Sequence, residues 1–175
     1  HEEFKSIEIV EMLKEVNHLR INALFDFTNM LNAYEKPLPA LKSMAPFIRQ
    51  VHLKGARIIQ EDKGYGQRGV VQGAPEDEMP YARMLYELLM LGEVEPQVIS
   101  FALEQEVSYY APAYRHADEG DNPFIPFKDP SETPFDKAGA DRILLDERRW
   151  ASNQVYFIRS LLAKMRWLAV SYLEN

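Results

Sequence analysis

The apolar positions of this chain alternate between short continuous runs and longer segments with helical spacing. Short runs bounded by polar residues are typical of buried strands, and they occur at 21–27, 47–53 and 96–106. Apolar residues that recur every three or four positions predict helices over 4–17, 37–47, 79–92 and about 141–173, the last as one long helix or a broken pair. Helix and strand therefore alternate along most of the chain.

The ends of the predicted helices carry residues that usually begin or stabilise a helix. Ser6 can cap the first helix, and Pro37 can open the second because proline is favoured in the first turn. The acidic run at 74–78 marks the start of the third helix, where negative charge complements the helix dipole. We expect the last helix to pack through its large apolar side chains, Trp150, Phe157, Leu161, Leu162 and Trp167.

Two stretches of the chain lack either pattern. Residues 60–78 are rich in glycine and predict a loop. In this loop, GYGQRG at 64–69 matches the letters of a dinucleotide-binding fingerprint, but no predicted strand leads into it and no helix follows directly. A flexible loop is the better interpretation. Residues 107–140 combine prolines, aromatics and aspartates without periodicity, and they predict an irregular excursion.

The alternation of strands and helices predicts an α/β fold whose parallel sheet is covered by helices. A complete eight-stranded β/α barrel usually takes about 250 residues. This 175-residue chain opens on a charged helix start with no strand before it. We therefore predict a single domain that forms the C-terminal part, about three β/α units, of a TIM (β/α)8 barrel. The barrel units would span 1–106, the irregular insertion 107–140 and the final helix 141–175.

Composition narrows the classes of function. The chain is 46% apolar and 27% charged, which is ordinary for a globular protein, and it has no cysteine, so a metal would need His, Asp or Glu ligands. Its net charge of −7 argues against a broad basic face, and we expect no nucleic-acid partner. No apolar run is long enough to span a membrane, and the start lacks a signal pattern, so we expect no membrane partner and a cytoplasmic location.

Each predicted strand ends on or beside a residue that can hold a metal. These residues are Asp26, His52 and Glu104. In parallel β/α folds the functional groups gather at the C-terminal ends of the strands. Two carboxylates and one imidazole would suit a divalent ion such as Mn, Mg, Co or Zn. The barrel has to bring the three strand ends together, so the fold and the site depend on each other.

Each of these residues also has a simpler interpretation. Asp26 taken alone fits a turn or a helix cap, and His52 between two apolar neighbours fits a hydrogen-bonded core histidine. Glu104 fits least well, because a buried carboxylate needs a cation or hydrogen-bond donors. Lys54 shares the face of His52 on a regular strand, and it could be a solvated lysine at the rim or a cation near the oxygens of a substrate.

Three short motifs give the chain a family resemblance. They are Asp-Phe-Thr-Asn at 26–29, His-Leu-Lys-Gly at 52–55 and Glu-Gln-Glu at 104–106. Their order resembles that of the xylose-isomerase-like TIM barrels, which include sugar phosphate isomerases and epimerases and AP endonuclease family 2. The resemblance covers most of residues 1–110. It implies a divalent metal held by Glu, Asp, His and Glu from four successive strands, of which the last three would be Asp26, His52 and Glu104.

The resemblance also implies an activity and partners. The family suggests a metal-dependent isomerase or epimerase that acts on a sugar or related polyhydroxy-carbonyl compound through an enediolate. Catalytic roles would fall to Glu104 and Lys54, and substrate contacts to His1, Asn29, Arg57 and Glu106. The first metal-binding glutamate would lie two residues before His1, so we expect the N-terminal half of the barrel as a partner, beside a small carbohydrate-like substrate. A homo-oligomer is a further option.

Other activities stay open on the same scaffold. One is a metal-dependent dehydratase of a cyclic polyol ketone, and another is a non-catalytic barrel fragment whose acidic residues serve packing. Departures from the family motifs argue against a third activity, the cleavage of abasic sites in DNA. Gly55 replaces a frequent aspartate, and Asn29 stands where the DNA-repair branch has a histidine ligand. A later Asp-x-His pair is also absent from 58–78, so we do not expect the trinuclear zinc chemistry of abasic-site cleavage.

Overall fold

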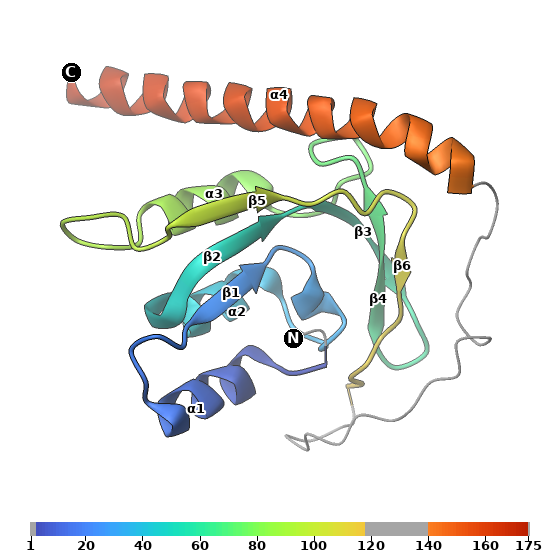
Figure 1. Ribbon diagram of the computed structural model, residues 1–175, viewed down its shortest axis with the longest axis horizontal. Coiled ribbons are helices and arrows are strands. Elements are labelled where there is room, and N and C mark those ends of the chain that lie inside the picture. Colours follow the sequence, from blue (N-terminus) through green and yellow to red (C-terminus); the bar gives the residue numbers. More distant parts are fainter. Residues whose placement is uncertain (1–2, 118–139, 175) are drawn as a thin grey trace.

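The structure is a computed structural model that describes residues 3–117 and 140–174, with side chains in the second range from 146 onward. Its helices and strands alternate from α1 to β2, a hairpin follows β2, and one long helix ends the chain (Figure 1). In chain order the elements are α1 (Ser6–Val16), β1 (Ala23–Asp26), the 3-10 helix η1 (Asn29–Leu31), α2 (Pro37–Met44), the 3-10 helix η2 (Ala45–Phe47), β2 (Ile48–Leu53), β3 (Gly55–Gln60), β4 (Tyr65–Val70), α3 (Tyr81–Leu89), β5 (Ser100–Leu103), β6 (Tyr110–Ala111) and α4 (Ala140–Leu173).

The three predicted strands form one parallel sheet in the order β1-β2-β5. Asp26 pairs with His52 at the ends of β1 and β2, and Leu53 pairs with Leu103 at the ends of β2 and β5. All three strands therefore finish at the same edge of the sheet. The predicted α/β class with a parallel sheet is confirmed.

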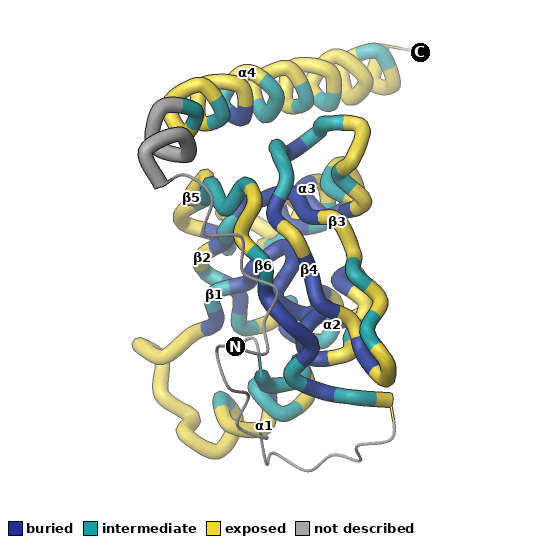
Figure 2. Tube along the Cα trace, turned by 90° about the vertical axis from the view of Figure 1, so that its right-hand side faces the viewer, coloured by how far each residue is buried: buried dark blue, intermediate teal, exposed yellow. Residues whose placement is uncertain are grey.

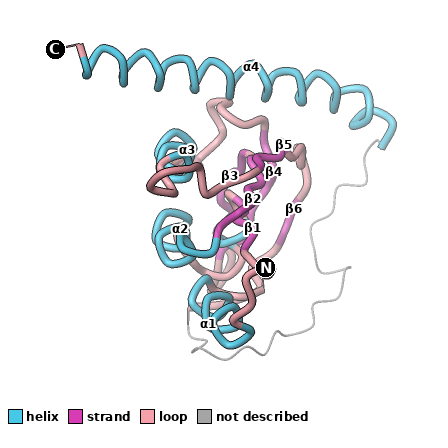
Figure 3. Tube along the Cα trace, turned by 60° about the vertical axis from the view of Figure 1, so that its left-hand side comes forward, coloured by secondary structure: helices cyan, strands magenta, loops and turns pink. Residues whose placement is uncertain are grey.

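Helices α1, α2 and α3 lie in a row along one side of this sheet (Figure 3). The core lies between these helices and the sheet. Its largest fully buried side chains include Phe25, Leu41, Met44, Val51, Leu53 and Met84. Burying each such side chain contributes about 1.5–3 kcal/mol to folding. Val51 and Leu53 are buried, whereas His52 between them is partly exposed, because successive side chains of a strand point to opposite faces. The alternation leaves His52 on the face away from the helices.

The glycine-rich stretch at 60–78 is not simply a loop, and this prediction is wrong. Residues 55–60 and 65–70 form the antiparallel hairpin β3–β4, which β6 extends into a second sheet. The glycines allow close approach of backbones. A Cβ at Gly69 would overlap the carbonyl oxygen of Glu106, and one at Gly66 would lie 2.8 Å from the carbonyl oxygen of Ala111. The fingerprint letters at 64–69 fall largely within β4, where no phosphate loop exists.

Two predicted helix starts also differ from the structure. Lys5, not Ser6, is the cap of α1, and Ser6 donates from its backbone nitrogen and its hydroxyl to the carboxylate of Glu35 at 2.8 and 2.5 Å. Helix α3 begins at Tyr81, after the acidic run has ended. Asp77 of that run accepts backbone hydrogen bonds from the start of β3 and from neighbouring loop residues instead. Both predictions failed because Ser6 and Asp77 form hydrogen bonds with residues distant in the sequence and do not cap the helices.

Helix α4 is continuous and crosses one end of the molecule beside α3 and β5 (Figure 1). Most of its described side chains are exposed, in contrast to those of β1, which are mostly buried (Figure 2). Ile158, Leu161 and Met165 pack against the core, but Trp167 is 67% exposed, so its predicted packing role is wrong. In the described part of the chain, no helix is long and apolar enough to cross a membrane.

Candidate metal centre

The ends of the three parallel strands bring three ligand-bearing side chains together. Asp26, His52 and Glu104 each offer one ligand atom, and these atoms all lie within 4.8 Å of one another. Strand register explains the convergence, because Asp26 and His52 are paired neighbours and the Glu104 backbone nitrogen donates to the Leu53 carbonyl at 2.9 Å. The predicted meeting of the three side chains is present in the structure, and their role as metal ligands stays a prediction.

Asp26 serves two purposes with its two oxygens. The side chain is fully buried, and Oδ1 accepts hydrogen bonds from the backbone nitrogens of Thr28 and Asn29 at 2.8 and 3.1 Å. This is the turn interpretation of the residue. Oδ2 points to the cluster, 3.8 Å from His52 Nδ1, and among the described residues it makes no hydrogen bond of good geometry. The turn holds the carboxylate in one orientation and leaves its second oxygen for the site.

His52 and Glu104 form the open side of the cluster. Nδ1 of His52 lies 3.3 Å from Oε2 of Glu104, and the two side chains are 30% and 31% exposed. His52 is therefore not a core histidine. Glu104 Oε2 is itself buried and, like Asp26 Oδ2, has no hydrogen-bond partner within the described residues. The two oxygens are therefore acceptors without a donor of good geometry, although both lie within ion-pair distance of Lys54.

Lys54 closes the buried side of the cluster. Its side chain is 3% exposed, and Nζ lies 2.7 Å from Glu106 Oε2 and 3.1 Å from both Asp26 Oδ2 and Glu104 Oε2. The interpretation of Lys54 as a solvated rim lysine is therefore wrong. Three carboxylates against one ammonium leave two uncompensated negative charges when all four groups are ionised. Such a deficit is costly at a buried site unless a further cation is present.

The pKa values of the three acids in the cluster shift in different directions. Burial raises the pKa of Asp26 and of Glu106 above their ordinary values, although Lys54 opposes this. Burial also acts to raise the pKa of Glu104, but Lys54 and His52 outweigh it and hold that pKa below its usual range. Burial lowers the pKa of Lys54 less than the three carboxylates raise it, so Lys54 is a stable cation at neutral pH. Glu104 is therefore the acid most readily ionised in the cluster.

The remaining predicted site residues fall into three groups. Asn29 is buried beside the cluster and accepts a hydrogen bond from Gln67 Nε2 at 3.4 Å, and Glu106 joins the cluster through Lys54. Arg57 is exposed on the hairpin, opposite Arg68, and no contact brings it to the cluster. His1 lies outside the described residues. The substrate roles of all four stay predictions.

The sequence interpretation missed Gln154 in helix α4. Its side chain is fully buried, and Nε2 donates to the carbonyl oxygen of Leu53 at 2.7 Å, next to His52. A signal for it was present. Gln154, Ile158, Leu161 and Met165 recur at helical spacing, so the glutamine occupies a position of the apolar stripe that faces the core.

The donor set fits a divalent metal. One imidazole and two carboxylates suit Mn, Co, Zn or Mg, and two of the available oxygens are buried without hydrogen bonds among the described residues. The Lys54 ammonium competes for the same two oxygens, because it lies 3.1 Å from each. Its shorter contact, 2.7 Å to Glu106, would still hold Lys54 in place if a metal were bound by the other two carboxylates.

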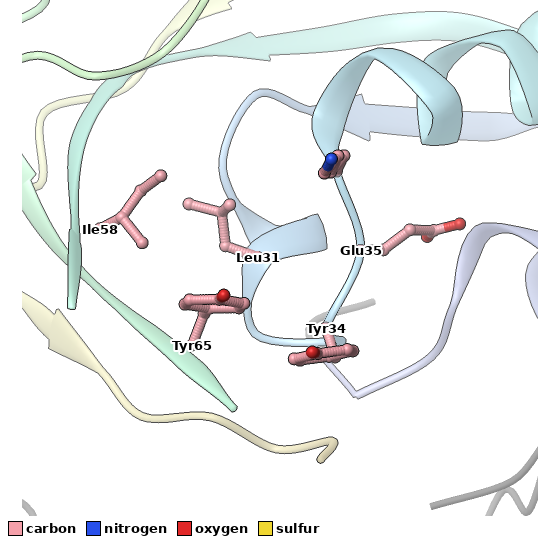
Figure 4. Close-up of a pocket in the computed structure, with 6 residues that line it drawn as sticks. Leu31, Tyr34, Glu35, Ile58 and Tyr65 are labelled. Carbon is pink, nitrogen blue, oxygen red and sulfur yellow. The ribbon is translucent and has the colours of Figure 1, made fainter. Parts of the chain in front are cut away.

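A hollow lies between the hairpin and the segment before α2 (Figure 4). It has a volume of about 340 Å³, and its walls are largely aromatic and aliphatic. The rings of Tyr34 and Tyr65 stack at 5.4 Å with an angle of 12°, and Leu31 and Ile58 face them. The residues that line this hollow include none of the predicted catalytic or metal residues. It is therefore separate from the strand-end cluster.

Comparisons with known proteins identify a related sequence and a solved structure with a similar fold. No family model matches the chain. It is 44% identical over 167 residues to the uncharacterized protein YihM of Escherichia coli (strain K12), and the match covers 95% of this chain and 51% of YihM. The chain thus spans about half the length of that curated relative.

A solved structure resembles the fold. It is the crystal structure of a xylose isomerase domain protein from Planctomyces limnophilus, with a TM-score of 0.50 and 20% sequence identity. The likeness covers 61% of this chain and 37% of that protein. Together with the parallel sheet, it shows a partial TIM-barrel-like fold and supports the resemblance to xylose-isomerase-like barrels at the level of fold.

Proposed function

We propose that this chain carries most of the metal site of an isomerase or epimerase that acts on a sugar or a related polyhydroxy-carbonyl compound. The observation that supports this most directly is the convergence of Asp26, His52 and Glu104, with their ligand atoms within 4.8 Å of one another. The residues come from three strands and meet at the edge of the sheet where β/α enzymes place their active sites. The likeness to a xylose isomerase domain protein agrees with this at the level of fold alone.

The residues of the cluster would divide the work. A bound divalent ion would polarise adjacent carbonyl and hydroxyl oxygens of the substrate. Asp26 and His52 would hold the ion, Asp26 in an orientation fixed by its turn. Glu104, ionised and partly exposed, would accept the proton from the substrate carbon and return it to the neighbouring carbon. Lys54 would stabilise the negative charge that develops on the substrate oxygen of the enediolate.

The rest of the site would involve further partners. We place Asn29, Glu106, Arg57 and His1 as substrate contacts, with Asn29 and Glu106 best positioned because they border the cluster. The chain spans half the length of YihM, and we propose that a further carboxylate ligand comes from outside the present sequence. The substrate itself would be a small carbohydrate-like molecule.

Metal analysis tests this proposal. The intact protein should retain or take up close to one equivalent of Mn²⁺, Co²⁺ or Zn²⁺, measured by elemental analysis and by titration calorimetry. His52→Ala removes one ligand and should weaken binding at least about tenfold, since each 1.4 kcal/mol of lost interaction is a factor of ten. His18→Ala is the matched control, because His18 is an exposed histidine away from the cluster. If activity on sugars is found, chelation should abolish it.

One observation favours a metal-free alternative. Lys54 already lies between Asp26 and Glu104, and a closed ion-pair cluster of this kind would serve a non-catalytic barrel module. In that case the wild-type protein binds none of the three metals, and His52→Ala behaves as wild type. Analysis of products would separate isomerisation from the dehydration that a related scaffold could perform.

A further inference from the structure

Helix α4 reaches the candidate metal centre through one buried side chain. Gln154 is 0% exposed in a helix whose described residues are mostly exposed. Its Nε2 donates to the Leu53 carbonyl oxygen at 2.7 Å and to Gln72 Oε1 at 3.1 Å. Its Oε1 accepts a hydrogen bond from Gln105 Nε2. The side chain therefore bonds to three separate segments behind the site.

Two of these partners lie between the residues of the cluster. Leu53 separates His52 from Lys54, and Gln105 separates Glu104 from Glu106. Glu104 and Glu106 both reach Lys54 Nζ, at 3.1 and 2.7 Å, so the residues on either side of Gln105 face the same group. Holding the middle residue of each triplet therefore fixes the direction in which its two neighbours point. One glutamine can orient four side chains of the cluster in this way.

The Leu53 carbonyl oxygen has a second partner that strengthens the connection. It also accepts the hydrogen bond from the backbone nitrogen of Glu104, at 2.9 Å. Gln154 thus bonds to the same oxygen that ties the end of β2 to the residue after β5. A shift of this carbonyl would move His52 and Glu104 relative to each other.

Gln72, Gln105 and Gln154 form a glutamine cluster, and stability alone would not favour these buried amides. Gln72 Nε2 and Gln105 Oε1 are buried and have no hydrogen-bond partner within the described residues. A buried polar atom without a partner is costly, and an aliphatic residue at position 154 would continue the stripe formed by Ile158, Leu161 and Met165. The cluster fits a requirement for orientation at the strand ends better than a requirement for packing.

We propose that Gln154 is a positioning residue through which α4 sets the geometry of the metal centre formed by Asp26, His52 and Glu104. The proposal rests on the proposed function of that site. Gln154 does not touch the metal or the substrate. It acts by holding Leu53 and Gln105, in the way that hydrogen-bond partners behind metal ligands tune a metal site.

The test replaces Gln154 with residues of similar size and no hydrogen bonds, Gln154→Leu and Gln154→Met, in the intact protein. Loss of an orienting partner typically costs about 10–100-fold in metal affinity, and we expect this for Mn²⁺ measured by calorimetry. The visible absorption spectrum of the Co²⁺-loaded protein should change in position or intensity, because it reports ligand geometry. The melting temperature should not fall by more than a few degrees, because an aliphatic side chain at position 154 extends the apolar stripe of the helix.

Leu161→Ala is the matched control on the same helix. It weakens the packing of α4 against the core without touching the glutamine cluster, so it should lower the melting temperature and leave the Co²⁺ spectrum and the Mn²⁺ affinity unchanged. Gln105→Leu removes one of the three hydrogen bonds of Gln154 and should reproduce part of the effect of Gln154→Leu. The double variant should be no worse than Gln154→Leu alone, because the bond that Gln105 makes to Gln154 is already lost there.

The outcomes separate this inference from the proposed function. If the wild-type protein binds none of Mn²⁺, Co²⁺ and Zn²⁺, the proposed function fails and this inference fails with it. If the wild type binds metal and both Gln154 variants keep its affinity and spectrum, the inference alone is overturned. It is also overturned if Leu161→Ala loses affinity to the same extent, because Gln154 would then only hold the helix in place. A Gln154 variant that does not fold leaves Gln105→Leu to decide.

Discussion

The parallel sheet and the antiparallel sheet of this chain meet at Lys54 but are held together by different means. Strands β1 and β2 bury apolar side chains such as Phe25 and Val51 against the helices, and Phe101 of β5 packs against the same core. Strands β3, β4 and β6 rely on close backbone approach at Gly69 and on buried amides, in which Gln67 Nε2 donates to Asn32 Oδ1 at 2.7 Å. The first sheet presents charged groups at its edge, and the second supports the loop that carries one of them.

The two sheets thus have separate roles, one in forming the site and the other in supporting it. Side-chain burial gives the parallel sheet a rigid edge, which can hold three carboxylates and a lysine at short distances. The antiparallel sheet brings residues 106–111 back to the strand ends, and Gly69 donates and accepts backbone hydrogen bonds there with Tyr109 and Ser108. Disturbing the two sheets should therefore have distinct consequences, and four substitutions test this.

The largest effect is expected for Gly69→Val in β4. A Cβ at this position would overlap the carbonyl oxygen of Glu106, so the strand or the returning chain has to move. We expect a loss of about 4 kcal/mol in the free energy of unfolding, measured in urea, which is at the severe end for one substitution. Arg68→Val, at the exposed neighbouring position, is the control and should be close to neutral. A mild effect at Gly69 would mean that the two segments do not approach closely.

A somewhat smaller effect is expected for Leu41→Ala in α2. Leu41 is fully buried against the parallel sheet, and the substitution leaves a cavity that costs about 3 kcal/mol. Leu168→Ala on α4, where the side chain is 59% exposed, should cost far less in the same urea experiment. Equal losses at the two leucines would contradict the assignment of the core to the layer between α1–α3 and the parallel sheet.

Asp77 supports the antiparallel sheet by accepting backbone hydrogen bonds from Ala56, Gly73 and Met79 at 3.2, 2.8 and 3.1 Å. Asp77→Ala leaves these donors without their partner, and we expect a loss of about 2 kcal/mol. Burial raises the pKa of Asp77 above its ordinary value of 3.8. A raised pKa in the folded state means that the contribution of the group is fully present below 3.8 and declines as the pH rises through the folded value.

The difference in unfolding free energy between wild type and Asp77→Ala should therefore be larger at about pH 4 than at neutral pH. Urea denaturation at both pH values measures it. A difference that grows with increasing pH would show that the pKa of Asp77 is lowered in the folded protein, contrary to the burial of its carboxylate.

The smallest effect is expected for Arg57→Ala on the exposed face of the hairpin. The guanidinium lies outside the strand-end cluster, so metal affinity should stay as in wild type and stability should change by no more than about 0.5 kcal/mol. His52→Ala provides the contrast, since it should reduce metal affinity with the rest of the fold intact. A loss of metal binding in Arg57→Ala would show that the hairpin takes part in the metal site and not only in its support.

The parallel sheet and the identity of the strand-end residues could be predicted from local sequence patterns. Continuous apolar runs report burial, which is a property of neighbouring residues in the chain, and Asp26, His52 and Glu104 follow directly from where those runs end. Local patterns did not predict β4. In a sequence, a glycine that allows two backbone segments to approach closely cannot be told from a glycine in a flexible turn.

Long-range contacts in the folded chain set which groups share the site and which residues hold them in place. Lys54 is buried between three carboxylates because the returning chain brings Glu106 to it, and no local pattern encodes a contact across 52 residues. Gln154 reaches Leu53 across 101 residues for the same reason. Secondary structure follows from short-range spacing, whereas the neutralisation and orientation of buried charges depend on partners that only the folded chain brings together.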